Sequence, residues 1–202
     1  MFNGLKKKKR FFLLIFISGF LFFFYFGLSQ QKFFLEKSTL SFTNSLEAKA
    51  ENKDCELKTE ERIVRGDSLS PVLEPGQKIK IFFDHYNCYE VKREDIVVLE
   101  YAGNPNPLVK IIKGLPGDSF YLEKNKSDWN ILINNEILKN SEGNPYVLSE
   151  QRQKMLSLYE RDYGGKIPSE SFLVLGNKVF GTVDSSYFGL IGKSSILGKV
   201  NF

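Results

Sequence analysis

Residues 64–73 read VRGDSLSPVL and place Ser68 between a Gly-Asp pair and a Leu-Ser-Pro run. Taken alone, they are also an ordinary composition for a strand that enters a turn. A second stretch, LVKIIKGLPGD at 108–118, places Lys110 inside an apolar strand that ends in a glycine-proline turn. A serine on a turn and a lysine in an apolar strand are the parts of a serine–lysine dyad, in which the lysine activates the serine.

Both stretches resemble sequence boxes of the bacterial type I signal peptidases. The first is similar to their nucleophile box, Ser-Met-x-Pro-Thr-Leu, and the second to their lysine box, Lys-Arg-x-x-Gly-x-Pro-Gly-Asp. REDIVVL at 93–99 resembles the family's Arg-Gly-Asp-Ile-Val-Val strand. LGNKVFGTVDSSYFG at 175–189 resembles its last box, Gly-Asp-Asn-x-x-x-Ser-x-Asp-Ser-Arg-Tyr-Trp-Gly. The resemblance extends over about residues 60–200.

The resemblance implies a membrane-anchored serine endopeptidase that removes N-terminal signal peptides from exported preproteins. In such an enzyme Ser68 would be the nucleophile and Lys110 the general base, with Thr182 and Asp184 as supporting residues. The substrate would have small residues at the first and third positions before the cut, and would pair as an extended strand near Ser68. The implied partners are signal-peptide-bearing preproteins and the lipid bilayer, and we expect a monomer.

Three positions depart from the family pattern close to the implied site. Gly66 stands where some members have a serine, so backbone N–H groups would carry more of the oxyanion binding. Thr182 stands where the family has a serine that hydrogen-bonds the catalytic lysine, and a threonine hydroxyl can make the same bond. Ser186 stands where the family has arginine, so we expect the usual ion pair with Asp184 to be absent and the site to be less rigid.

Lys110 has sequence neighbours that suit a general base. A lysine accepts a proton only when it is neutral, and burial favours the neutral form. Leu108 and Ile112 share a strand face with Lys110 by alternation. The alternative is an outward-pointing lysine on an edge strand, where lysine hinders unwanted strand pairing. The two boxes favour the catalytic interpretation, and Lys113, on the opposite face, is the weaker candidate.

Other chemistry has little support in the sequence. The only histidine, His85, lies in FFDHYNC and belongs to no triad motif, so we expect an ordinary loop residue, as we do for Asp67 in its turn. Two cysteines and one histidine do not make a metal site, and no cofactor is expected. The sequence leaves open whether Cys55 and Cys88 form a disulfide, because it does not place their Cα atoms.

The positive charge of the chain is concentrated at its beginning. The net charge is +4, and it falls to −1 once the five cations of KKKKR at 6–10 are set aside. A basic end on a nearly neutral body is not the charge distribution of a nucleic-acid-binding protein. We therefore expect no nucleic-acid partner.

Residues 11–28, FFLLIFISGFLFFFYFGL, contain no charged residue. At about 1.5 Å per residue they form about 27 Å of helix, enough to cross a bilayer core. A cleavable signal peptide is the alternative, but the run is longer than its usual apolar region and no Ala-x-Ala follows it directly. We predict a single-pass anchor in the cytoplasmic membrane, with residues 1–10 as a cytoplasmic basic tail and the rest on the outer face.

From residue 62 the pattern is typical of short β strands separated by turns. One soluble helix is predicted at 149–163, capped by Ser149 and ended by the glycine pair at 164–165. We predict a mainly β protein in which an antiparallel β-sheet domain of signal-peptidase type follows the transmembrane helix. The expected divisions are a linker at 29–60, a catalytic β domain at 60–118 and 171–202, and an inserted cap of hairpin plus helix at 119–170.

Three other functions are alternatives to a general signal peptidase. A specialised maturation peptidase for one secreted or conjugative-apparatus substrate is favoured by the altered last box and the long linker. A non-catalytic, membrane-tethered peptide-binding relative is disfavoured by the presence of both Ser68 and Lys110. A self-cleaving repressor has a similar serine box, but it needs a DNA-binding domain upstream, where this chain has its apolar segment.

Overall fold

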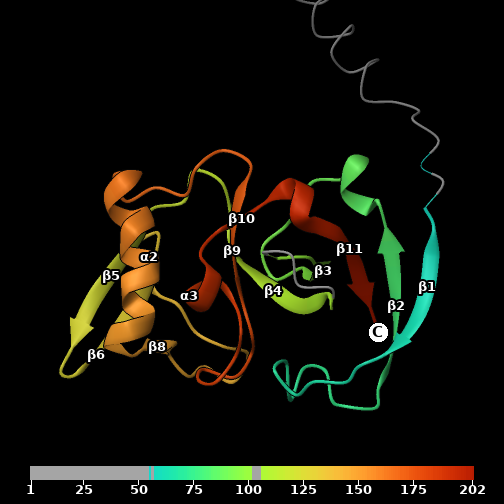
Figure 1. The fold of residues 1–202 in the computed structure, drawn as a ribbon, viewed down its shortest axis with the longest axis horizontal. Helices are drawn as coiled ribbons and strands as arrows, with labels where there is room; N and C mark the ends of the chain where they lie inside the picture. The colour runs from blue at the N-terminus through green and yellow to red at the C-terminus, as the bar shows by residue number, and fades with distance from the viewer. Residues whose placement is uncertain (1–54, 56, 102–105) are drawn as a thin grey trace, which may run out of the picture. The chain divides into compact units, whose positions relative to one another are not determined.

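The computed structural model describes residues 55, 57–101 and 106–202, which form two antiparallel sheets, one long helix and short helical segments (Figure 1). The larger sheet has the strand order β1-β2-β11-β3-β4-β9-β10. The bounds of its strands are β1 Thr59–Ile63, β2 Lys78–Phe83, β11 Ile196–Asn201, β3 Ile96–Leu99, β4 Leu108–Gly114, β9 Ser171–Leu175 and β10 Ile191–Gly192. The predicted mainly antiparallel β fold is confirmed.

The smaller sheet has the order β5-β6-β7, and β8 pairs with β6. Its strands are β5 Phe120–Asn125, β6 Asp128–Ile133, β7 Glu136–Ile137 and β8 Val147–Leu148. All four strands belong to the segment 119–170, which also holds helix α2. The short helices, η1 His85–Asn87, α3 Ser185–Phe188 and η2 Lys193–Ser195, lie in connections of the larger sheet.

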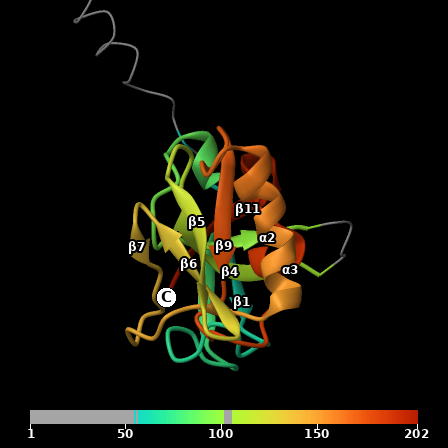
Figure 2. The same cartoon turned by 90° about the vertical axis from the view of Figure 1, so that its left-hand side faces the viewer.

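Helix α2, Glu150–Asp162, is the predicted soluble helix. Ser149 caps it by accepting a hydrogen bond from the backbone N–H of Arg152, and Gly164 and Gly165 follow it with φ of 60° and 70°. Such left-handed backbone angles favour glycine, which is why the helix ends here. Helix α2 packs over β5 and β6 and beside α3 (Figure 2). Leu156 of this helix is completely buried.

Strand β4 lies between β3 and β9, with Lys110 paired to Val97 and Ile111 paired to Leu175. The position of β4 excludes the alternative in which Lys110 guards an edge strand. The pairing of β4 with β9 shifts register between Ile112 and Gly114. Lys110 therefore pairs with β3, and the pairing with β9 begins at the next residue, Ile111.

Strand β9 belongs to both halves of the core. Its residues Leu173 and Leu175 pack with buried residues of the smaller sheet and with Leu156 of α2. Full burial of one leucine side chain stabilises a fold by about 1.5–3 kcal/mol. A second cluster joins Leu69 and Leu73 to β2, β3 and β11, so the turn after Ser68 is anchored in the core of the larger sheet.

A disulfide joins Cys55 to Cys88, with 6.3 Å between their Cα atoms. It links the chain just before β1 to the loop after η1, which answers the question that the sequence left open. Within 55, 57–101 and 106–202, no helix is both long and apolar enough to cross a membrane. The predicted tail, the anchor at 11–28 and linker residues 29–54 lie outside the described residues, whereas the last two predicted linker residues begin β1.

Candidate active site

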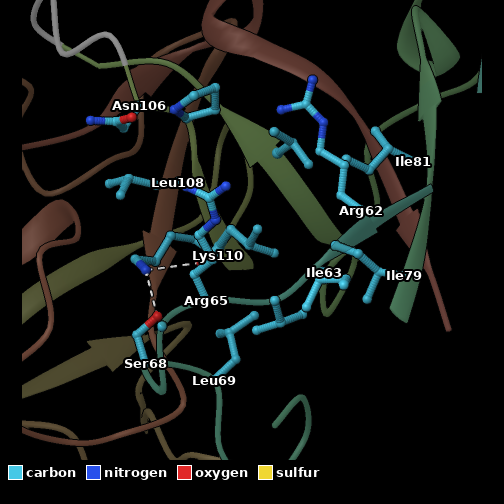
Figure 3. Close-up of a pocket in the computed structure, with 15 residues that line it drawn as sticks. Arg62, Ile63, Arg65, Ser68, Leu69, Ile79, Ile81, Asn106, Leu108 and Lys110 are labelled. Carbon is cyan, nitrogen blue, oxygen red and sulfur yellow. Dashed lines mark hydrogen bonds between the residues drawn. The ribbon is translucent and has the colours of Figure 1, made fainter. Parts of the chain in front are cut away.

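Ser68 and Lys110 are hydrogen-bonded, with 2.8 Å between Oγ and Nζ (Figure 3). Ser68 lies in the turn that precedes Pro71, and Lys110 projects from the centre of β4. A neutral lysine at this distance can accept the hydroxyl proton, as the general base of an activated serine must. The structure therefore brings together the two residues that the sequence boxes singled out.

Burial sets the protonation of Lys110. The side chain is only 3% exposed, and its Nζ also donates to the carbonyl oxygen of Val109 at 2.9 Å. Desolvation lowers the pKa of Lys110 to about 8, while the negative charge of Asp184 opposes this by raising it. With that pKa about one molecule in ten is neutral at pH 7, compared with roughly one in 2,500 for an ordinary lysine.

The loop after β9 holds the peptide group of Ser68 in place. The backbone N–H groups of Asn177 and Lys178 donate to the carbonyl oxygen of Ser68 at 2.7 and 3.2 Å. The side chain of Asn177 also donates to the carbonyl oxygen of Ser70 at 3.0 Å. On the other side, Leu69 is buried in the core. The serine thus lies between the core and a hydrogen-bonded loop.

Asp184 caps α3 and is the centre of a buried network. Its Oδ1 accepts from the backbone N–H and hydroxyl of Ser186 at 3.0 and 2.6 Å. Its Oδ2 accepts from the N–H of Gly176 at 3.1 Å and from the hydroxyl of Thr182. Among the described residues, no hydrogen bond joins Thr182 to Lys110. Thr182 therefore acts on Asp184 in this structure, and its predicted bond to the lysine stays a prediction.

The ion pair with an arginine at position 186 is absent, as expected, but Asp184 has an arginine partner from another element. Arg152 of α2 places Nη1 4.0 Å from Asp184 Oδ1, and the same nitrogen donates to the carbonyl oxygen of Thr182 and to the hydroxyl of Ser186. The cation comes from the helix rather than from position 186. No pattern within 175–189 could have indicated this contact, because the arginine lies outside that stretch of the sequence.

A cavity of about 570 Å³ opens beside the serine (Figure 3). Its floor is apolar, and its rim carries cationic side chains from β1 and from the segment that follows it. Lining residues include Leu69, Ile79, Ile81 and Val98 in the floor, and Arg62 and Arg65 at the rim. β1 is the outermost strand of the larger sheet on this side. The arrangement suits an extended peptide with small or apolar side chains.

Gly66 also lines this cavity, and a Cβ added there would have no atom within 4 Å. Among the described residues, none accepts a hydrogen bond from the backbone N–H of Ser68. A donor left available beside the nucleophile is what oxyanion binding requires. This N–H is therefore the candidate donor for the backbone oxyanion binding that glycine at position 66 implies.

The remaining charged and polar candidates lie apart from the dyad. Asp67 is exposed and forms an ion pair with Lys178. Lys113 is buried and pairs with Glu94 at 2.8 Å rather than with a nucleophile. His85, the first residue of η1, stacks on Tyr89 after that helix. In the part of the chain that the structure describes, no group of histidine, cysteine, aspartate and glutamate is arranged to hold a metal ion.

Comparison with known proteins gives consistent relatives. Residues 55–202 match the model of a family described as "Signal peptidase, peptidase S26". The chain is similar to signal peptidase IB of Staphylococcus aureus, with 30% identity over 146 residues that cover 69% of this chain and 74% of that protein. It is also similar to signal peptidase I of Bacillus caldolyticus, with 30% identity over 151 residues that cover 69% and 76%.

A crystal structure of a signal peptidase I from Enterococcus faecalis V583 also matches. The TM-score is 0.40 and the identity is 22%, over 56% of this chain and 98% of that one.

Proposed function

This chain belongs to the signal peptidase family, peptidase S26, and is a serine endopeptidase that cleaves signal peptides from preproteins; we propose that Ser68 and Lys110 carry out the cleavage. The observation that supports this assignment best is the distance of 2.8 Å between Ser68 Oγ and Lys110 Nζ, with the lysine buried in a central strand. A buried amine with a lowered pKa is the group that can accept the serine proton.

The reaction proceeds in two halves. Neutral Lys110 takes the proton from Ser68 as Oγ attacks the carbonyl carbon of the scissile peptide bond. The resulting ammonium gives that proton to the leaving amine, so the C–N bond breaks and the signal peptide remains as an ester on Ser68. Lys110 then takes a proton from water, which attacks the ester. The lysine returns this proton to Ser68 Oγ as the signal peptide leaves with a free carboxyl group.

The oxyanion is bound by the backbone N–H of Ser68 in this proposal. The turn that carries this N–H is fixed by buried Leu69 and by the loop at Asn177, so the donor is held before the substrate arrives. A donor that needs no rearrangement contributes most to the stabilisation of developing charge. Gly66 leaves space next to the serine for the substrate backbone.

The substrate lies in the cavity as an extended strand. The segment 63–66 borders the cavity on one side, and residues 107–109 border it on the other. Backbone pairing with these segments gives affinity, while alternate side chains enter the cavity and give specificity. The apolar floor agrees with small side chains at the first and third positions before the cut, as the family resemblance implies.

We also propose the domain and membrane arrangement. Residues 60–118 and 171–202 form the catalytic domain, and residues 119–170 form a cap. Residues 11–28 anchor the monomer in the cytoplasmic membrane, with the N-terminus on the cytoplasmic side. The apolar, uncharged composition of 11–28 supports the anchor. The Cys55–Cys88 disulfide supports an extracytoplasmic catalytic domain, since cytoplasmic thiols are kept reduced. Substrates whose own apolar segment lies in the same membrane would then be close to Ser68.

Two of the alternatives lose support from the geometry. The specialised maturation peptidase was favoured by the altered last box, and Arg152 supplies the cation that this box lacks. The non-catalytic relative does not account for a lysine buried against a serine hydroxyl.

Ser68→Ala tests the proposal directly. Full-length protein in detergent is incubated with a preprotein, and cleavage at the signal-peptide junction is followed on a gel. Wild type should cleave and Ser68→Ala should not, with the thermal midpoint nearly unchanged. Ser70→Ala is the matched control in the same turn, because that hydroxyl donates to Glu74 rather than contacting Lys110. Cleavage by Ser68→Ala above a tenth of wild type would reject Ser68 as the nucleophile.

A further inference from the structure

Arg152 reaches from helix α2 to the loop that connects β9 and α3. It is the third residue after the cap Ser149, and its backbone N–H bonds to that cap. Its side chain is 29% exposed. The first turn of a helix usually favours acidic side chains, because its free N–H groups carry partial positive charge. A partly buried arginine there calls for a specific partner.

The partners of the guanidinium all belong to one short segment. Nη1 donates to the carbonyl oxygen of Thr182 at 2.6 Å and to the hydroxyl of Ser186 at 2.8 Å, and it lies 4.0 Å from Asp184 Oδ1. The hydroxyl of Ser186 in turn donates to the same oxygen of Asp184. One nitrogen therefore connects both ends of the segment 182–186 and faces the carboxylate between them.

The docking of α2 does not depend on this contact. Leu156 of the same helix is fully buried in the core shared with β9. A buried leucine contributes about 1.5–3 kcal/mol, whereas a partly exposed ion pair contributes about 0–1 kcal/mol. The contact of Arg152 with the segment 182–186 is thus available for a purpose other than holding the helix.

We propose that Arg152 is a positioning residue for the serine–lysine pair, which holds Asp184 in place and balances its negative charge next to Lys110. This inference rests on the proposed function, since it assigns Arg152 a task toward the general base. The cap segment then contributes to catalysis through one side chain, although it supplies neither residue of the dyad.

Charged and titratable groups from several elements face Lys110 or its neighbour Asp184. They are Asp184 itself at the start of α3, Arg152 of α2 behind it, Arg65 and Arg62 at the cavity rim, and Tyr146 before β8. Burial raises the pKa of Tyr146, so it stays neutral near pH 7. Arg62 is paired with Glu60. Of these groups, Asp184 raises the pKa of Lys110, and Arg152 is the cation that lies against Asp184.

The sign of the effect of Arg152 follows from this arrangement. Asp184 raises the pKa of Lys110 because a carboxylate favours the ammonium form. A guanidinium at 4.0 Å from the carboxylate offsets part of that attraction. Without the guanidinium, Lys110 would remain protonated to a higher pH, and a smaller fraction would be able to act as a base.

The test compares four full-length proteins in detergent by their kcat/KM against pH, with a preprotein-derived peptide as substrate. They are wild type, Arg152→Gln, Arg152→Lys and Arg161→Gln. Arg161 is the matched control because it is an exposed arginine on the same helix and its ion-pair partner is Asp162.

We expect Arg152→Gln to lower kcat by about tenfold near pH 7 and to move the midpoint of the acidic limb upward by about half a pH unit or more. KM should change little, because neither Arg152 nor Asp184 lines the substrate cavity. Arg152→Lys keeps the charge and should keep the midpoint close to that of wild type. Arg161→Gln should match wild type in both quantities.

The midpoint does not depend on the fraction of molecules that fold, so a poorly folding variant still gives a readable result. An Arg152→Gln midpoint equal to that of Arg161→Gln would overturn the inference and would leave Arg152 with a structural role only. This outcome would not affect the proposed function, which fails separately if Ser68→Ala still cleaves.

Discussion

The backbone N–H of Asn177 donates a hydrogen bond of 2.7 Å to the carbonyl oxygen of Ser68. The residue before it, Gly176, passes so close that an added Cβ would lie 2.8 Å from the same oxygen and 2.6 Å from Thr182. The loop after β9 therefore fits against the nucleophile without space for a methyl group. The position of the serine depends on this close approach.

Gly176→Ala should move the loop away from Ser68 because backbone cannot give way as a flexible side chain does. We expect a loss of about 1–3 kcal/mol in the free energy of unfolding. We also expect kcat to fall by at least about tenfold, because small displacements of a nucleophile are costly. Gly192→Ala is the control, since its nearest neighbour would lie at 3.7 Å. Equal kcat in the two variants would show that the loop does not set the position of the serine.

Lys110→Arg tests the protonation state that catalysis requires. Burial lowers the pKa of Lys110 to about 8, so kcat/KM of wild type should rise with pH and reach half its maximum near pH 8. Arginine keeps the positive charge but does not release its proton, so Lys110→Arg should be inactive up to about pH 10. Lys166→Arg, at an exposed position, should follow the wild-type profile. Activity in Lys110→Arg would mean that a fixed cation suffices, against the proposed mechanism.

The same buried lysine makes stability depend on pH. Its pKa is about 8 when folded and 10.5 in its ordinary state, so between these values the unfolded chain binds more protons. The cost of burying the ammonium is present in full below pH 8 and disappears above 10.5. The free energy of unfolding of wild type relative to Lys110→Met should therefore rise by up to about 3 kcal/mol across this range. Urea denaturation at several pH values measures the difference, and a difference that stays constant would contradict the burial of a titrating amine.

The Cys55–Cys88 disulfide should matter for substrate binding as well as for stability. It fixes the chain just before β1, the strand that leads into the cavity wall. Replacing both cysteines by serine should lower the free energy of unfolding by about 2–4 kcal/mol. KM should rise more than kcat falls, because the dyad lies on other elements. A reducing agent should affect wild type in the same direction and leave the double variant unchanged. A fall in kcat at constant KM would assign the disulfide to the dyad instead.

The sequence predicted what depends on local pattern. The apolar alternation around Lys110 and the serine box led to two residues that the fold places 2.8 Å apart. The capping serine and the glycine pair fixed both ends of α2, because these are local signals. β7 and β8 have two residues each, too few for any periodicity, and they were missed for that reason.

Contacts between distant segments could not be predicted from the sequence. Ser186 offers no charge to Asp184, and the cation comes instead from Arg152, on a helix in another part of the chain. The hydrogen bonds from Asn177 to Ser68 use backbone atoms, which leave no trace in residue type. Such contacts follow from the way β9 is shared between the two halves of the core.

Strand β11 lies between β2 and β3, although both of these precede it by about a hundred residues or more in the chain. A growing polypeptide that has not yet added residues 196–201 cannot close the larger sheet, because β2 and β3 have no direct pairing with each other. Asp184 and the loop at 176–178 are also made late. We therefore expect the alignment of Ser68 with Lys110, and with it peptidase activity, to appear only after residues 196–201 have been made.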